Sequence, residues 1–389
     1  MSEKQSSVIV KLIPIMAAFF VMGFVDLVGI ATNYVKVDFA LSDSTANLLP
    51  SMVFLWFLIC SVPTGMLMNK IGRRKTVLIS LVLTIVALII PMVSYSFASM
   101  MLSFAFLGIG NAVLQVSLNP LVSALVTGEK LASTLTFGQF VKAIASFSAP
   151  IIAAWAAAYF GNWKYLYAVF IIFPVIVFIA LSLEKIKEEE TTGKVSTFTE
   201  CFSLLGDGVI LLCFLGIICH VGVDVGVNVT APKILTERLG FDLSKAGYAT
   251  SLYFLFRTIG SFLGAIILAR MAMKKFFIFS AVLLAAAMAV LAFAHAQWII
   301  YVCIAALGFA NSNIFSMIFS RALLHKPEKK NEVSGLMIMG VFGGTGFPLL
   351  MGFASDAVKA QSGAVLVMLV GAAYLIFLAA GKEKKASKA

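Results

Sequence analysis

Charged residues are scarce in this sequence. Of its 389 residues, 12% are charged and 61% are hydrophobic. A soluble domain usually carries about 25% charged residues, because the surface that it exposes to water is where its charged side chains lie. The shortage excludes a soluble globule of this length and indicates a polytopic, all-α membrane protein.

Motifs for metal, nucleotide and covalent chemistry are also missing. The five cysteines lie in or beside apolar segments, without the spacing of metal ligands or of a disulfide framework. The sequence contains neither a Walker A loop nor a nucleophile elbow, so ATP drive and hydrolase chemistry are unsupported. We therefore expect no enzyme activity, no cofactor and no metal site.

The sequence instead contains a series of long apolar blocks. Several reach the roughly 20 residues that a membrane-spanning helix needs. The blocks are continuous rather than alternating, which favours helices over a membrane β-barrel. The twelve predicted spans cover residues 12–34, 48–68, 77–95, 99–125, 135–159, 166–183, 209–231, 246–268, 276–294, 298–319, 335–353 and 365–380.

Basic residues are distributed unevenly between the two sets of loops. Most of the 29 lysines and arginines fall in the loops on the side of the chain termini. Because positively charged loops stay inside, both termini are predicted to be cytoplasmic, in a bacterial-type inner membrane. The net charge of +11 is then a topology signal, and no nucleic-acid partner is inferred from it.

The second half of the chain repeats the first. The segment Leu107-Gly-Ile-Gly-Asn111 recurs as Leu307-Gly-Phe-Ala-Asn311, 200 positions later, and other matches share that offset. Six spans per half, with like orientation, make a parallel repeat about an axis along the membrane normal. The predicted domains are therefore residues 1–183 and 208–389, joined by a cytoplasmic loop at 184–207.

The loop after the second span carries the most specific motif. Its sequence, Gly65-Met-Leu-Met-Asn-Lys-Ile-Gly72-Arg73-Arg74-Lys75, resembles the G-x-x-x-D-[RK]-x-G-[RK]-[RK] signature of the major facilitator superfamily. The resemblance implies two six-helix bundles related by pseudo-two-fold symmetry. In that family the motif's acid helps to latch the two halves on the cytoplasmic face. Asn69 stands at that position here.

A narrower resemblance lies in the fourth and fifth spans. Leu114-Gln115-Val-Ser-Leu-Asn119-Pro120, followed by Thr136-Phe-Gly-Gln139, is similar to the fucose/glucose/galactose permease branch. That branch consists largely of sugar–proton symporters, with some sodium-coupled relatives. Its fucose permeases carry a Glu where this chain has Gln115. They also carry an Asp in the first span, and Asp26 lies in the corresponding helix of this chain, without a residue-for-residue match. The resemblance implies a monosaccharide substrate and a coupling cation.

Four charged residues interrupt the predicted spans: Asp26, Lys142, Asp224 and Arg257. An isolated charge at the bilayer centre costs roughly 2.5–3.5 kcal/mol on insertion scales, and such residues are usually paired and functional. In the implied fold Asp26 adjoins Lys142, and Asp224 and Arg257 form the equivalent pair. Proton coupling and static ion pairing both remain open, and His220, one turn from Asp224, either titrates or packs.

Polar side chains form a stripe on the fourth span, where Asn111, Gln115 and Asn119 recur every four residues. The seventh span repeats the pattern with His220, Asp224 and Asn228. In the implied fold both stripes face a central cavity, and amide groups suit sugar hydroxyls because they donate and accept. The alternative is hydrogen bonding between helices.

Aromatic rings offer a weaker signal, since they can stack on the partly apolar face of a sugar. The predicted substrate-binding residues are Asn33, Asn111, Gln115, Asn119, Gln139, Asn228, Asn311, Phe137 and Tyr253, and the predicted proton-coupling residues are Asp26, Lys142, Asp224, His220 and Arg257.

The function that these features favour is import of a hexose or deoxyhexose by cation-coupled symport with alternating access. The coupling ion is expected to be a proton, with sodium as the alternative, and the protein is expected to act as a monomer in the lipid bilayer. A proton-driven exporter of small amphipathic compounds and an uncoupled sugar facilitator remain alternatives. A membrane sensor without transport is a third.

Overall fold

The computed structural model describes residues 3–41, 45, 48–184, 197–241, 246 and 248–381. All regular structure in these ranges is helical, and twelve of the helical segments are long and apolar enough to cross a membrane. The prediction of a twelve-span, all-helical membrane protein is confirmed. Several helices extend beyond the predicted spans into polar residues. α10, for example, continues to Leu239, whereas the predicted span ends at residue 231.

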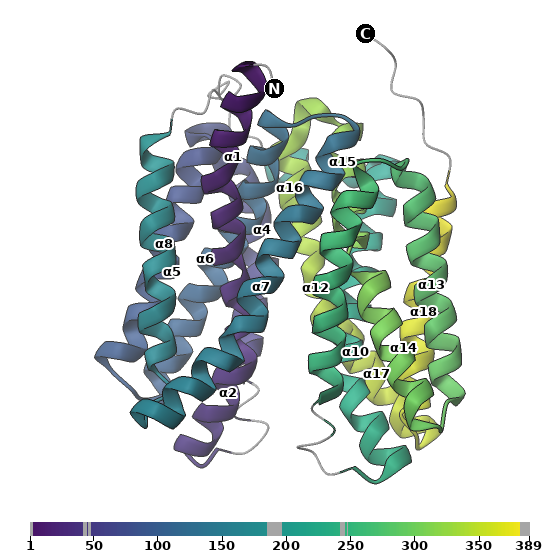
Figure 1. The fold of residues 1–389 in the computed structure, drawn as a ribbon. Helices are drawn as coiled ribbons and strands as arrows, with labels where there is room; N and C mark the ends of the chain where they lie inside the picture. The colour runs from purple at the N-terminus through teal and green to yellow at the C-terminus, as the bar shows by residue number, and fades with distance from the viewer. Residues whose placement is uncertain are drawn as a thin grey trace. The chain divides into compact units, whose positions relative to one another are not determined.

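Contacts between residues divide the chain into two compact units. The first comprises Met1–Thr127, Val141–Phe202 and Lys329–Met339, and the second comprises Gly128–Phe140, Ser203–Glu328 and Gly340–Ala389. Within each unit the helices run side by side as a bundle (Figure 1). The predicted domain limits at 183 and 208 stay a prediction, since residues 185–196 of the joining loop lie outside the described ranges.

The helices of the first half are α1 (Glu3–Met22), η1 (Gly23–Asp26), α2 (Leu27–Asp38), α4 (Leu48–Ile71), α5 (Arg73–Val93), α6 (Phe97–Leu125), α7 (Glu129–Phe160) and α8 (Tyr165–Leu183). Those that follow are α9 (Phe198–Ser203), η2 (Leu204–Gly206), α10 (Gly208–Leu239), α12 (Tyr248–Leu268), α13 (Met273–Phe293), α14 (Gln297–Asn311), α15 (Ile314–His325), η3 (Pro327–Lys329), α16 (Lys330–Met339), η4 (Gly340–Phe342), α17 (Gly343–Val358) and α18 (Ser362–Ala380).

Small residues allow close helix crossings at matching places in the two halves. A side chain on Gly108 of α6 would meet the Val53 carbonyl of α4 at 2.6 Å. A side chain on Gly308 of α14 would meet the Tyr253 carbonyl of α12 at 2.4 Å. Glycine lets membrane helices pack backbone against backbone. Both partners are 200 positions apart, so the repeat seen in the sequence is also a repeat of packing.

The first span is broken in its middle. α1 gives way to the 3-10 turn η1, and α2 then begins with Asp26 as its N-cap residue. A 3-10 stretch within a helix leaves backbone groups in need of other partners, and it often marks a functional position. The break therefore places one of the four interior charges at a helix end rather than on a regular helix face.

The signature loop that contains Asn69 (Gly65–Lys75) is joined to α16 by side-chain hydrogen bonds within the first unit. Asn69 Nδ2 donates to Glu332 Oε1 at 2.7 Å, and Asn331 Nδ2 donates to Asn69 Oδ1 at 2.6 Å. Arg73 Nε donates to Asn331 Oδ1 at 2.8 Å. Glu332 is 5% exposed and lies 3.9 Å from Lys329 Nζ. A carboxylate thus adjoins the motif, although it comes from the eleventh span instead of position 69.

The N-terminus of α10 is capped by Asp207, whose Oδ1 accepts from the amides of Val209 and Ile210 at 2.9 and 3.3 Å. His325 and Lys326 lie 3.0 and 3.3 Å from the same carboxylate. Partial burial alone would raise the pKa of Asp207, but the bonds from His325 and the two amides outweigh it and lower the pKa to about 2. The cap is therefore ionised at neutral pH.

Close packing of α4 on α16 gives a first prediction. A methyl group on Gly65 would lie 2.7 Å from the Asn331 carbonyl, so Gly65→Ala must push the two backbones apart. Overpacking of this kind costs about 1–3 kcal/mol, and we expect a lower midpoint of thermal unfolding in detergent. Gly352→Ala on α17 is the matched control, because no atom lies within 4 Å of its added methyl. Equal midpoints for the two variants would contradict the crossing.

Candidate functional site

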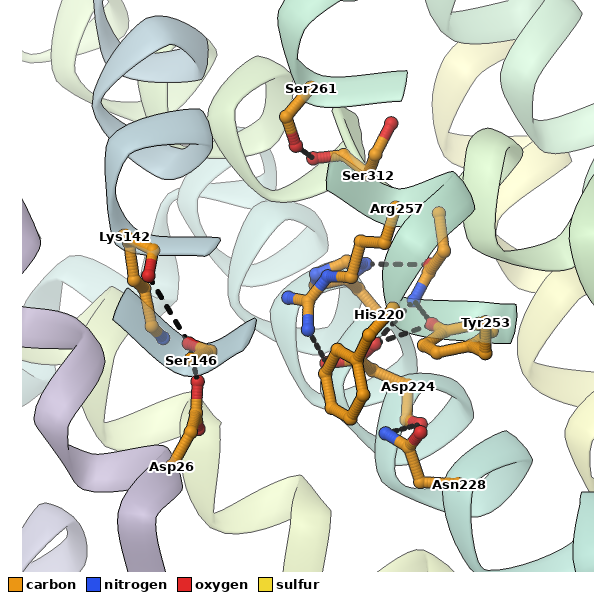
Figure 2. A network of polar contacts seen from close by, with 12 residues as sticks. Asp26, Lys142, Ser146, His220, Asp224, Asn228, Tyr253, Arg257, Ser261 and Ser312 are labelled. Atoms are coloured by element: carbon orange, nitrogen blue, oxygen red, sulfur yellow. Dashed lines mark hydrogen bonds and ion pairs between the residues drawn. The ribbon is translucent and has the colours of Figure 1, made fainter. Parts of the chain in front are cut away.

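A polar network surrounds Asp224 in the second unit (Figure 2). Arg257 Nη1 on α12 lies 3.0 Å from Asp224 Oδ2 on α10, and the two side chains are 21% and 13% exposed. The Tyr253 hydroxyl donates to Asp224 Oδ1 at 2.5 Å. The predicted neighbours Asp224 and Arg257 are therefore brought together, and a charge-assisted pair of this kind is strong.

Asn311 of α14 orders this network. Its Nδ2 lies 3.2 Å from Asp224 Oδ1 and 3.0 Å from the Tyr253 hydroxyl, and its Oδ1 lies 2.9 Å from His220 Nδ1. Because the amide nitrogen donates to the first two, its oxygen must accept, so His220 carries a proton on Nδ1. Tyr253, predicted as a stacking residue, uses its hydroxyl in the network.

Asn228, the third member of the predicted stripe on the seventh span, is held by its own helix. Its Nδ2 donates to the Asp224 carbonyl at 3.0 Å, one turn earlier. The Thr250 hydroxyl donates to the Asn228 carbonyl at 3.4 Å. Its Oδ1 is buried and has no hydrogen-bond partner. Asn228 therefore offers one acceptor and no side-chain bond to the Asp224 carboxylate.

Asp26 has a different environment in the first unit. The Ser146 hydroxyl on α7 donates to Asp26 Oδ2 at 2.5 Å and lies 3.2 Å from the Lys142 carbonyl (Figure 2). α7 can lie close to the first span because residue 23 is a glycine. A β-carbon at Gly23 would lie 2.5 Å from the Lys142 carbonyl. The structure thus places Lys142 one turn from the serine that binds Asp26. Sequence reasoning missed Ser146 as the partner, although it lies four residues beyond Lys142.

The stripe on α6 is a relay of amides. Asn111 Nδ2 donates to the Met22 carbonyl at 2.8 Å, Gln115 Nε2 to Asn111 Oδ1 at 2.7 Å, and Asn119 Nδ2 to the Gln115 carbonyl at 2.9 Å. Met22 ends α1, so Asn111 satisfies a carbonyl at the break in the first span. Asn119 is 1% exposed, and its Oδ1 has no partner. Each amide nitrogen thus donates one hydrogen bond, and one buried acceptor remains.

The other predicted residues have simpler positions. Phe137 is 40% exposed, and its ring centroid lies 5.9 Å from that of Phe140. Gln139 is half-buried on α7. Asn33 belongs to α2, but its side chain lies outside the described atoms. Among the described residues, no group of three or more His, Cys, Asp or Glu could hold a metal ion.

This twelve-span repeat with polar networks around interior charges defines a class of membrane transporter. Residues 15–336 and 212–389 match the sequence pattern described as the Major Facilitator Superfamily. The chain belongs to that family, as its signature loop predicted, and is a multi-pass membrane protein.

Individual relatives span almost the whole chain. A "Glucose/galactose transporter" of Brucella abortus biovar 1 (strain 9-941) is 26% identical over 378 residues, which cover 92% of this chain and 90% of the relative. The chain is therefore similar to the glucose/galactose branch, as the motifs in the fourth and fifth spans predicted.

Two solved structures share the fold. The Escherichia coli fucose:proton symporter FucP aligns with a TM-score of 0.84 at 18% identity, over 96% of this chain and 98% of that one. The proton:xylose symporter XylE, bound to 6-bromo-6-deoxy-D-glucose, aligns with a TM-score of 0.77 at 14% identity, over 96% of this chain and 95% of that one. At these identities the likeness establishes the fold and leaves the substrate to be argued from the residues.

The Asp224–Arg257 pair gives a second prediction. Arg257→Leu removes one partner and leaves a carboxylate uncompensated in the membrane interior, which costs about 3–5 kcal/mol. We expect a lower thermal midpoint for this variant and recovery in Asp224→Asn/Arg257→Leu, which removes both charges. Arg270→Leu, at an exposed position, is the matched control. A single variant as stable as the wild type, or a double variant no better than the single, would contradict a structural pair.

Proposed function

We propose that this protein imports a monosaccharide, a hexose or deoxyhexose, by proton-coupled symport with alternating access. The proposal places it in the bacterial inner membrane, with both termini cytoplasmic. Relatives named as glucose/galactose transporters at 26% identity support the substrate class, and fold neighbours named as fucose:proton and proton:xylose symporters support the coupling. The side chains supply the argument for how coupling works.

The observation that carries the proposal is the contrast between the two interior carboxylates. Asp224 faces a guanidinium at 3.0 Å, whereas Asp26 accepts its hydrogen bond from the neutral hydroxyl of Ser146. Protonating Asp224 would leave the cation of Arg257 without its partner, which is costly at low dielectric. Protonating Asp26 keeps its contact with Ser146, because a hydroxyl can accept a hydrogen bond as well as donate one. We therefore assign proton coupling to Asp26, with Lys142 as the nearby charge that responds to it.

Substrate binding is assigned to the amide relay of α6. A sugar hydroxyl can donate to a buried oxygen that lacks a partner, and Asn119 Oδ1 is such an oxygen. Gln115, adjoining it in the relay, replaces the second acid of the fucose-permease pattern, so this part of the path is neutral. A neutral stripe of amides with a buried acceptor suits a polyhydroxylated ligand better than an amphipathic compound.

Uptake by proteoliposomes tests the substrate class. Under an inward proton gradient, we expect accumulation of at least one hexose or deoxyhexose. One-proton symport can concentrate the sugar up to about tenfold per pH unit, because each tenfold ratio corresponds to about 1.4 kcal/mol. Uptake that only equilibrates would indicate a facilitator, and uptake driven by sodium alone would replace the proton. Absence of uptake and counterflow for every sugar of the panel would overturn the sugar assignment.

Asp26→Asn separates coupling from transport. The amide keeps the size and an acceptor for Ser146 but cannot exchange a proton, so sugar counterflow should persist while accumulation falls to the level without a gradient. Asp356→Asn, which removes an exposed acid of α17, is the control and should accumulate sugar normally. Undiminished accumulation in Asp26→Asn would remove Asp26 from the coupling role.

A further inference from the structure

Two charged residues of opposite sign occupy equivalent places in the repeat. Asp38 is the last residue of α2, and Arg238, 200 positions later, lies in the last turn of α10. α10 contains Asp224, and Asp26 is the N-cap residue of α2. α2 begins after Asp26 and has 12 residues, so Asp38 lies about 18 Å along the helix from it. Asp224 lies at a similar distance from Arg238 on α10.

In the first repeat Asp38 ties the end of α2 to two connecting segments. Trp163 Nε1, between α7 and α8, donates to Asp38 Oδ2 at 2.9 Å, and the Tyr95 hydroxyl, between α5 and α6, donates to the same oxygen. Burial first, and then the bond to Asp38, raise the pKa of Tyr95 above its usual range, so its hydroxyl remains a donor.

Aromatic contacts reinforce this end of the first unit. Tyr34 of α2 stacks on Trp163, with ring centroids 5.0 Å apart and planes at 10°. Lys164 Nζ lies 3.9 Å from the centre of the Tyr95 ring, within cation–π range. Trp163 is 5% exposed, so it is not one of the lipid-facing tryptophans that anchor helices at the membrane surface. The cluster therefore holds α2 to its own bundle.

In the second repeat Arg238 makes the equivalent tie by different chemistry. Its Nη1 donates to the carbonyls of Leu291 and Ala294 at 2.7 and 2.5 Å, and its Nη2 donates to Ala292 at 2.9 Å. Leu291 and Ala292 lie in the last turn of α13, and Ala294 follows its last residue, Phe293. Carbonyls at a helix end lack partners and carry partial negative charge, so a guanidinium fork satisfies them well.

We propose that Asp38 and Arg238 are positioning residues. Asp38 fixes the end of α2, the helix that Asp26 caps, and Arg238 fixes the end of α10, the helix that contains Asp224. Asp38 would hold Asp26 against Ser146, and Arg238 would hold Asp224 and His220 in the Asn311 network. The inference rests on the proposed function for its transport readout, but the ties themselves can be tested without transport. The two ties should affect different properties, because Asp26 exchanges a proton and Asp224 keeps its ion pair.

The first experiment compares Asp38→Ala with Asp38→Asn and with Asp356→Ala as the control. A misplacement of about 1 Å can change a rate up to about a hundredfold, so Asp38→Ala should lower Vmax at least about tenfold and move the pH midpoint of uptake. Asn keeps an oxygen that accepts from both Tyr95 and Trp163, and should restore the wild-type pH profile. A pH profile unchanged in Asp38→Ala would overturn the positioning role of Asp38.

The second experiment uses Arg238→Gln, with Lys233→Gln on the same helix as the control. Loss of the fork should raise the KM for sugar about tenfold, as expected when a site is displaced, and leave the pH midpoint of uptake unchanged. Arg238→Lys, which lacks the planar fork, should recover little of the affinity. A KM equal to that of the wild type, or rescue by Lys, would overturn the role of Arg238.

Hydrogen exchange separates failure of this inference from failure of the proposed function. In Asp38→Ala the backbone amides of α2 should exchange at least about tenfold faster than in the wild type, whereas Asp356→Ala should leave them unchanged. In a variant that keeps Trp163 as its sole tryptophan, Asp38→Ala should also alter the indole emission. If no sugar is transported but exchange accelerates, the tie stands and the sugar assignment falls. Unchanged exchange overturns the tie.

Discussion

A carboxylate in the membrane interior must be paired with a cation or take up a proton, and the rest of this structure depends on how that requirement is met. Arg257 pairs with Asp224, and Tyr253 and Asn311 also contact its carboxylate. Asp26 accepts a hydrogen bond from the Ser146 hydroxyl at the break in the first span. We therefore propose that Asp224 keeps its charge beside Arg257 and that Asp26, held by a neutral hydroxyl, exchanges the proton.

The repeat supplies the same scaffold twice and fills it with different chemistry. Asn111 and Asn311 occupy equivalent positions and each reaches back to the first span of its half, to the Met22 carbonyl in one case and to His220 and Asp224 in the other. Tyr253 replaces Val53 at the shared helix crossing and adds a hydroxyl to the second network. Duplication thus conserves helix packing while the polar residues diverge toward separate tasks.

The amino-acid sequence was sufficient to predict the fold and part of the candidate site. Long apolar blocks must become spanning helices, because backbone groups in lipid need partners within the same segment. Charged residues within membrane spans usually pair with one another, and Asp224 and Arg257 are adjacent as expected. Ser146 was not predicted as the partner of Asp26, nor Glu332 as the partner of Asn69. A single serine, or a single acid in the first turn of a helix, leaves no periodic pattern in the sequence. The break at η1 was also missed, since Gly23 reads equally well as a packing residue.

Infrared spectroscopy of the interior carboxyl groups tests most directly whether Asp26, rather than Asp224, exchanges the proton. The absorption band of a protonated carboxyl group is followed against pH in wild type, Asp26→Asn and Asp224→Asn/Arg257→Leu. If Asp26 is the proton site, a titrating band is present in the wild type and the double variant and absent in Asp26→Asn. A band that survives in Asp26→Asn, or that disappears only when Asp224 is removed, would contradict this assignment.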